Sequence, residues 1–170
     1  MLSKCKGFMV AELISISLIP KLIRAKSWIS CLYVRMNIQV AVLCDAATDD
    51  NGKLNFLGAF DTIYAPQLPA VHPQCAVALR VTFMSGDVGD RKLKLNFVNA
   101  DGRAIMPPID IPVTVALPDD AYFLTRNFII NIQQLKFTEA GLYSVDIRLD
   151  GESKANIPLQ VKNPPPRAEA

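Results

Sequence analysis

From residue 37 onward, hydrophobic and polar side chains alternate with a period of two for most of the chain. This period puts every second side chain on the same face of an extended segment, so each run predicts a strand with one buried face. There are eight such runs. We expect their inward-facing side chains to be Ile38, Val40, Val42 and Cys44; Leu54, Phe56, Gly58 and Phe60; Cys75, Val77, Leu79, Val81 and Phe83; Leu93, Leu95 and Phe97; Ile109, Ile111, Val113 and Val115; Phe128, Ile130 and Ile132; Tyr143, Val145, Ile147 and Leu149; and Ala155, Ile157, Leu159 and Val161.

Turn-forming residues separate these runs: DDNGK at 49–53, NADG at 99–102 and DGES at 150–153. No convincing amphipathic helix lies between them. The pattern therefore predicts an all-β fold, an antiparallel immunoglobulin-like β-sandwich of about seven to eight strands over residues 36–163. Residues 164–170, rich in proline, are predicted to form an extended, disordered tail.

Two of the runs contain a proline at an outward-facing position, Pro112 in IPVTV and Pro158 in IPLQV. Proline has no backbone N–H to donate to a neighbouring strand, so both runs are predicted to be edge strands. Proline at an edge also prevents pairing with the edges of other molecules.

The segment LKFTEAGLYSVDIRL at 135–149 contains a turn that leads straight into a strand. Its phrase EAGLYSV resembles the D-x-G-x-Y-x-C phrase of immunoglobulin domains, in which a tyrosine bonds back to the backbone and fixes a corner. Gly141 would supply the permissive backbone and Tyr143 would be the corner residue. Val145 stands where the cysteine would be, which removes the inter-sheet disulfide. The alternative is that Tyr143 is only a buried aromatic residue of a strand.

Residues 1–35 differ from the rest of the chain in composition. They carry six basic groups and one acid, whereas the remaining residues carry 12 basic and 15 acidic groups. The apolar run at 8–19 is broken by Glu12 and is too short for a membrane span, which needs roughly 20 residues. We expect a non-core extension that precedes the true start at Met36. A targeting signal and a helix lying on a membrane surface are the alternatives.

The segment MNIQVAVLCDAATDDNGKLNFLGAFDTIYAPQLPA, which begins at Met36, together with the later MPP at 106–108, resembles an uncharacterised bacterial family of small β-sandwich proteins. The resemblance covers residues 36 to about 162. It implies the sandwich fold, a bacterial origin and a start at Met36, and it brings no catalytic residues.

Charge and cysteine content narrow the choice of function. The acidic balance after residue 35 argues against a nucleic-acid surface, which needs clustered Lys and Arg. Four cysteines without C-x-x-C spacing and a single histidine, His72, argue against a zinc site. Cys44 and Cys75 fall on inward positions, where we expect small buried side chains, with a disulfide as the alternative. His72 lies in a proline-rich connection and is expected to be solvated.

Carboxylates gather in the connections between predicted strands. Because antiparallel strands alternate in direction, the first, third, fifth and seventh connections should share one end of the sandwich. Calcium binds six to eight oxygen ligands, so this end could form a calcium site, or else an acidic docking surface or ordinary turns. The candidate metal ligands are Asp45, Asp49, Asp50, Asp87 and Asp90.

These observations favour a non-enzymatic protein-interaction or structural module without a cofactor. Its partner is expected to be another protein, with no nucleic acid and no membrane span. The low cysteine density fits the cytoplasm, or export if residues 1–35 are a signal. The alternative function is a calcium-dependent binding domain at the acidic end. The segment IMPPID at 105–110 could mark an exposed binding edge or only a bulge.

Overall fold

The structure is a computed structural model that describes residues 36–164. The predictions for residues 1–35 and for the tail lie outside the described residues, except Pro164. Nine strands and one short 3₁₀ turn make up the described part. In chain order these are β1 (Asn37–Asp50), β2 (Lys53–Phe60), β3 (Thr62–Tyr64), β4 (Ala70–Met84), the 3₁₀ turn η1 (Ser85–Asp87), β5 (Gly89–Asn99), β6 (Ile109–Val115), β7 (Phe123–Phe137), β8 (Gly141–Leu149) and β9 (Glu152–Lys162).

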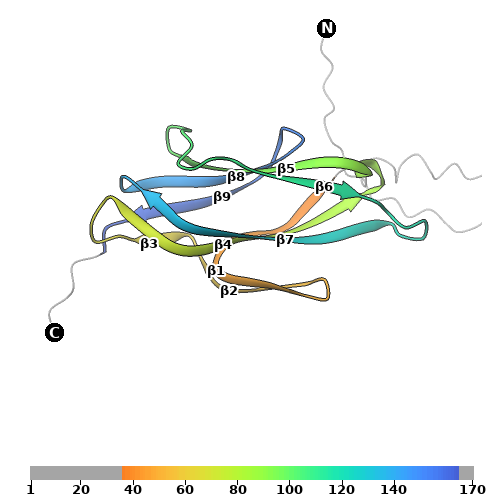
Figure 1. The fold of residues 1–170 in the computed structure, drawn as a ribbon, viewed down its shortest axis with the longest axis horizontal. Coiled ribbons are helices and arrows are strands. Elements are labelled where there is room, and N and C mark those ends of the chain that lie inside the picture. Colours follow the sequence, from red (N-terminus) through yellow and green to blue (C-terminus); the bar gives the residue numbers. More distant parts are fainter. Residues whose placement is uncertain (1–35, 165–170) are drawn as a thin grey trace, which may run out of the picture. The chain divides into compact units, whose positions relative to one another are not determined.

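The strands form two stacked sheets, with β5, β6, β8 and β9 in one layer and β1, β4 and β7 in the other (Figure 1). The four-stranded sheet has the order β2-β1-β4-β7, and the five-stranded sheet has the order β3-β9-β8-β5-β6. All pairs are antiparallel except β3 with β9. The prediction of an all-β sandwich is therefore confirmed. The additional strand is β3, whose three residues are too few to show a period in the sequence.

The main core lies between the two sheets and contains most of the side chains that the alternation predicts to face inward. Phe83, Phe97 and Phe137 are the largest fully buried side chains. The runs that begin at Cys75 and Leu93 supply buried residues at every predicted position. In the runs from Ile109 to Val161 the predicted positions likewise belong to the core or pack against it.

The first strand departs from the predicted alternation. The register between β1 and β4 shifts between Ile38 and Val40, which indicates a β-bulge. One extra residue reverses the faces that follow it. As a result Ala41 and Leu43 face the main core, and Cys44 faces the opposite side of its sheet. The predicted inward positions of Val42 and Cys44 are therefore wrong.

The outer face of β4 is covered by the hairpin of β1 and β2, which folds back across it. β1 pairs with β4 only as far as Cys44, yet it stays paired with β2 up to Asp50. Figure 1 shows this hairpin leaving the plane of its sheet. Arg80, on the outer face, donates from Nη1 to the carbonyl of Gly52 at the hairpin tip at 2.7 Å.

A second, small core fills the space under the folded hairpin. Cys44, Ala76 and Ala78 are almost fully buried there, and partly buried Leu54 and Ile129 pack against them. Alanine carries only a methyl group, so the two alanines allow the hairpin to approach the sheet closely. Both faces of β4 are consequently buried, which accounts for its nearly continuous run of buried residues.

The two prolines occupy different kinds of strand. β6, which contains Pro112, is an edge strand as predicted. β9 is an interior strand, which corrects the prediction for Pro158. However, β3 pairs only with residues 160–162 of β9 and leaves Pro158 uncovered. The N–H of Gln160 points toward β3, to the carbonyl of Asp61. The nitrogen of Pro158, two residues earlier, faces the same open side, where no donor is required.

Candidate functional site

The corner before β8 has the contact that the sequence phrase suggests. The Tyr143 hydroxyl donates a hydrogen bond to the carbonyl of Glu139 at 2.8 Å. The ring packs edge-on against Phe137, with 5.0 Å between centroids, and only 6% of the residue is exposed. Gly141 has a φ of +154°, outside the usual range of L-residues. Both residues fix the entry of β8 and have a structural role.

The first three candidate metal ligands belong to the folded hairpin and not to an open loop. Asp49 accepts hydrogen bonds from the Gly52 N–H and from the Asn127 side chain, and these bonds hold its pKa below the ordinary value. Asp50 accepts from Asn51. Asp45 lies within β1, and its carboxylate lies against the backbone of Gly58 on β2.

The other two candidates are Asp87, the last residue of η1, and Asp90, at the start of β5. The Asp87 carboxylate accepts from the N–H of Met84 at 2.9 Å and is largely buried. Asp90 accepts from the hydroxyl of Thr114 on β6 at 2.8 Å. Each carboxylate thus closes a local turn or strand pair, the ordinary role of aspartate in such places.

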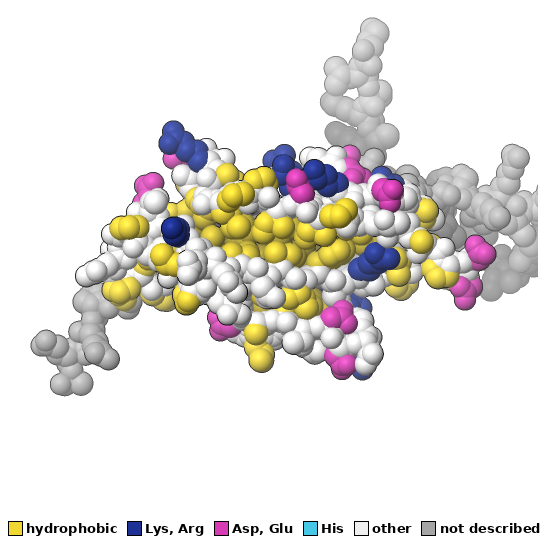
Figure 2. All heavy atoms as spheres, in the orientation of Figure 1, with side chains coloured by type: hydrophobic (Ala, Val, Ile, Leu, Met, Phe, Trp, Pro, Cys, Tyr) yellow, Lys and Arg dark blue, Asp and Glu magenta, His cyan; other side chains and the backbone are white. Residues whose placement is uncertain are grey.

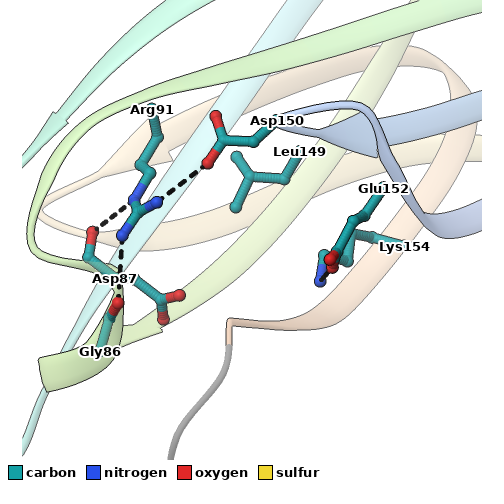
Figure 3. Close-up of a pocket in the computed structure, with 7 residues that line it drawn as sticks. All are labelled: Gly86, Asp87, Arg91, Leu149, Asp150, Glu152 and Lys154. Carbon is teal, nitrogen blue, oxygen red and sulfur yellow. Dashed lines mark hydrogen bonds and ion pairs between the residues drawn. The ribbon is translucent and has the colours of Figure 1, made fainter.

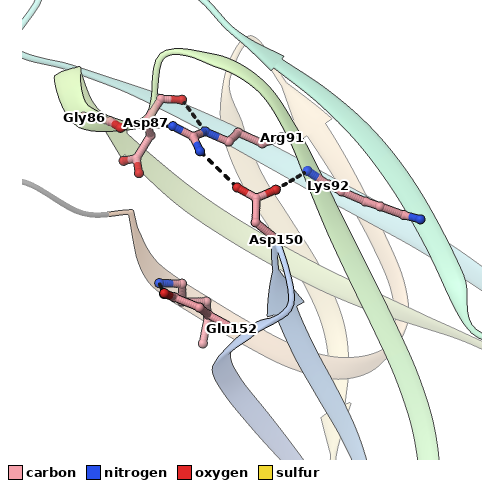
Figure 4. A network of polar contacts seen from close by, with 7 residues as sticks. Gly86, Asp87, Arg91, Lys92, Asp150 and Glu152 are labelled. Atoms are coloured by element: carbon pink, nitrogen blue, oxygen red, sulfur yellow. Dashed lines mark hydrogen bonds and ion pairs between the residues drawn. The ribbon is translucent and has the colours of Figure 1, made fainter.

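Arg91 organises a polar network between η1 and the β8–β9 turn (Figure 3). Its guanidinium donates to the carbonyls of Asp87 and Gly86, both at 3.0 Å, and to the Asp150 carboxylate at 3.1 Å. The second oxygen of Asp150 accepts the backbone N–H of Lys92 (Figure 4). Because every nitrogen of the guanidinium already donates, Arg91 serves as a cross-link between two connections.

A hollow of about 340 Å³ lies beside this network. Glu152 and Lys154 line it and form an ion pair at 2.8 Å (Figure 3). The charged groups of this hollow are thus engaged with one another, and they leave no converging set of free oxygens for a cation.

The structure does not bring the five candidate metal ligands together. The β4–β5, β6–β7 and β8–β9 connections share one end, as alternation predicts, but the β1–β2 hairpin folds onto the outside of its sheet (Figure 1). Within residues 36–164, no group of three or more His, Cys, Asp or Glu side chains could hold a metal ion. The prediction of a single acidic end assumed that every connection lies at an end of the sandwich. The number and order of predicted strands do not show that β1 bends and carries its hairpin onto the outer face of the sheet.

The single histidine and the two described cysteines lie in or beside the sheet of β1 and β4. His72 belongs to β4, not to a loop, and its Nε2 is buried without a hydrogen-bond partner among the described residues. Its ring contacts that of Phe60, with 5.5 Å between centroids. Cys44 and Cys75 are buried free thiols, and burial raises the pKa of Cys75 to about 11. Such a thiol is a poor nucleophile.

The feature that the sequence did not predict is the free edge of β7. This strand is 15 residues long and pairs with β4 along its whole length. In the described part of the chain, no strand pairs with its other edge. Its centre, NFIINIQ at 127–133, has no charge, no proline and no glycine. A long, uncharged edge strand is a template for pairing with another chain.

The other strand edges of the described part are short or protected. β3 has three residues and β6 has seven, with a proline at its middle. β2 is bent at Gly58. β7 has Arg126 near its start and an irregularity at Gln134, whose φ is +52°, shortly before Lys136. Between these two points its edge carries no device that discourages pairing.

An apolar surface accompanies this edge. Figure 2 shows hydrophobic side chains exposed between the β6 side and the β7 side of the sandwich. Ile109 and Ile111 of β6 and Phe128 and Ile130 of β7 are only partly buried there. We call the free edge of β7 with these four side chains the β7 cleft.

Residues 36–164 form a β-sandwich in which no described strand pairs with the outer edge of β7. The chain belongs to a family of unknown function (DUF6941), whose family model matches residues 39–162. A comparison with curated proteins found no match. Within residues 36–164, no helix has the length and apolar character that crossing a membrane requires.

Two solved structures are similar to this chain in part. One is the alkylpurine DNA glycosylase AlkC of Pseudomonas fluorescens bound to DNA containing an abasic site analogue, with a TM-score of 0.44 and 6% identity over 78% of this chain and 32% of that one. The other is a glycosyl hydrolase family 2 member from Bacteroides cellulosilyticus, with a TM-score of 0.40 and 11% identity over 74% and 15%. The chain thus spans about a third or less of each.

Proposed function

We propose that this protein is a non-enzymatic interaction module that binds an extended segment of another protein as an added strand along β7. The observation that carries the proposal is the outer edge of this 15-residue strand, which no strand within residues 36–164 pairs with. Backbone N–H and C=O groups along such an edge bind a strand of almost any sequence, and side-chain pockets provide the selectivity.

The β7 cleft supports this proposal because its partly buried apolar side chains could provide that selectivity. A strand added to β7 directs every second side chain toward the core side of the sandwich. There it would cover Phe128 and Ile130, and it would approach Ile111 of β6, all three of which are partly buried. Burial of apolar area contributes roughly 25 cal/mol per Å², so the apolar contacts would add to the hydrogen bonds.

The rest of the molecule is in keeping with binding and not with catalysis. The charged groups of the hollow beside Arg91 pair with one another, and both described thiols are buried. We extend the proposal to a bacterial, cytoplasmic protein that acts without a cofactor and without nucleic acid. The bacterial origin rests on the family resemblance, and the location rests on the low cysteine content.

A peptide-display selection on the full chain tests strand addition. Selected peptides are resynthesised with N-methyl groups on every second residue, in the two possible phases. An added strand bonds to β7 through one of its edges only, so methylation in one phase should abolish binding and methylation in the other should leave it. Equal tolerance of both phases would refute strand addition.

Hydrogen exchange provides the location. Peptide binding should slow exchange at alternate amides of residues 127–133, since those amides gain a bond. The amides of β2, the opposite edge of the same sheet, serve as the internal control and should not change. Protection at β2 or β6 in place of β7 would place the binding site elsewhere.

A further inference from the structure

The charges that flank the β7 cleft indicate which extended segment it takes. Arg126 and Lys136 are the only charged residues of β7, and both are basic. Both are exposed. Their side chains form no ion pair with any described residue. Each cation is therefore available to a bound partner.

Arg126 directly precedes the uncharged centre, and Lys136 lies three residues beyond it. Ten residue steps separate the two cations, which is about 33 Å along an extended strand. Lys136 lies on the outer face of β7, because Leu135 and Phe137 on either side of it are buried. Arg126 pairs with Val81, a core residue, so it is on the core-facing side of β7 and opens into the cleft. A charge that points inward on an edge strand opposes indiscriminate pairing. Arg126 still allows pairing with a strand that places a carboxylate beside its guanidinium.

We infer that the partner of β7, as proposed above, is an extended segment of about ten residues with alternating apolar side chains and a carboxylate at each end. A carboxylate at both ends satisfies Arg126 and Lys136 whether the segment runs parallel or antiparallel to β7. A second copy of this chain does not fit, because β7 contains no acid and would bring only like charges to the interface.

Three synthetic peptides test this inference on the full chain. They share an alternating isoleucine and threonine centre and end in Glu, Gln or Lys. Exposed ion pairs are individually weak, and two of them together should strengthen binding about tenfold at low salt. We expect the Glu peptide to bind tightest and the Lys peptide weakest, and the difference to shrink at 0.5 M NaCl.

Charge-reversal variants assign the effect to the two cations. The double variant Arg126→Glu, Lys136→Glu should invert the order of the three peptides. Lys162→Glu is the matched control, because Lys162 is also an exposed lysine near a strand end, but it pairs with β3 at the far side of the other sheet. The control should leave the order unchanged.

The outcomes separate the two proposals. The three peptides could bind with equal affinity while N-methylation in one phase alone still abolishes binding. That result overturns the inference that the partner carries acidic ends, and it leaves strand addition along β7 standing. If the affinity depends on the charge at the peptide ends but is the same for both N-methylation phases, strand addition is overturned. A concentration-dependent dimer of the parent chain that the peptides dissociate identifies a second copy as the occupant and overturns the acidic partner. No binding by any peptide overturns both.

Discussion

The hydrogen bond of Tyr143 can be removed with little other change to the molecule. In Tyr143→Phe the ring keeps its edge-on contact with Phe137, and only the hydroxyl that donates to Glu139 is lost. A net hydrogen bond contributes roughly 1 kcal/mol, and an acceptor left without its partner in a part-buried place adds to the loss. We therefore expect a decrease of about 1–2 kcal/mol in the free energy of unfolding.

This decrease should be measurable by two methods. A domain of this size loses roughly 3–5 °C of melting temperature per kcal/mol, so Tyr143→Phe should melt about 3–10 °C below the parent. Urea unfolding should give a lower midpoint with an unchanged slope, because the surface exposed on unfolding stays the same. Tyr122→Phe is the matched control: Tyr122 is 91% exposed, and we expect no shift.

The result also decides what the phrase around Gly141 and Tyr143 means. If Tyr143→Phe unfolds within 0.3 kcal/mol of the parent (roughly the resolution of such comparisons), the hydroxyl contributes nothing and Tyr143 acts only as a buried ring. If Tyr143→Leu is much less stable than Tyr143→Phe, the ring contact with Phe137 contributes as well. If Tyr143→Phe and the control Tyr122→Phe lose the same free energy of unfolding, the hydrogen bond from Tyr143 to Glu139 is not the cause of the loss.

Three further predictions concern pH and backbone conformation. Burial raises the pKa of Cys75 from 9.0 to about 11, so stability should be complete below about pH 9 and fall as pH rises toward 11; Cys75→Ala should lack this alkaline loss in chemical unfolding. Hydrogen bonds lower the pKa of Asp49 below 3.8, so its contribution is present above that pH and disappears as pH falls through the lowered pKa; Asp49→Asn should reduce this acid dependence in the same assay. In Gly58→Ala the new Cβ would meet the Asp45 carboxylate at a φ of +63°, and we expect a loss of about 1–2 kcal/mol; Gly58→Asn should lose less, because Asn adopts this conformation more readily.

Most of the core could be predicted from the alternation alone. In the runs from Cys75 to Val161, the residues expected to face inward do so, because a period of two has only two phases and the apolar residues select one. The prediction was wrong for Phe56, which is 41% exposed. It was wrong for Val42 and Cys44 because a bulge between Ile38 and Val40 reverses the phase. A bulge of this kind leaves no glycine or proline in the sequence to reveal it.

The candidate site could not be found by the same method. The carboxylates of DDNGK have the chemistry of cation ligands, but in the structure their hydrogen bonds close a turn. The free edge of β7 depends on the order of strands in the sheet, which the sequence does not give. One signal was present: NFIINIQ lacks the proline that protects IPVTV and IPLQV.

The order of strands in the five-stranded sheet has a consequence for synthesis. Its adjacent strands β8 and β9 follow β3, β5 and β6 in the chain and are therefore made after them. At about 5–20 residues per second, residues 141–162 take about 1–4 s to be added. During that interval β5 lacks its neighbour β8, and β3 lacks its neighbour β9. The five-stranded sheet therefore closes only after β8 and β9 have been made.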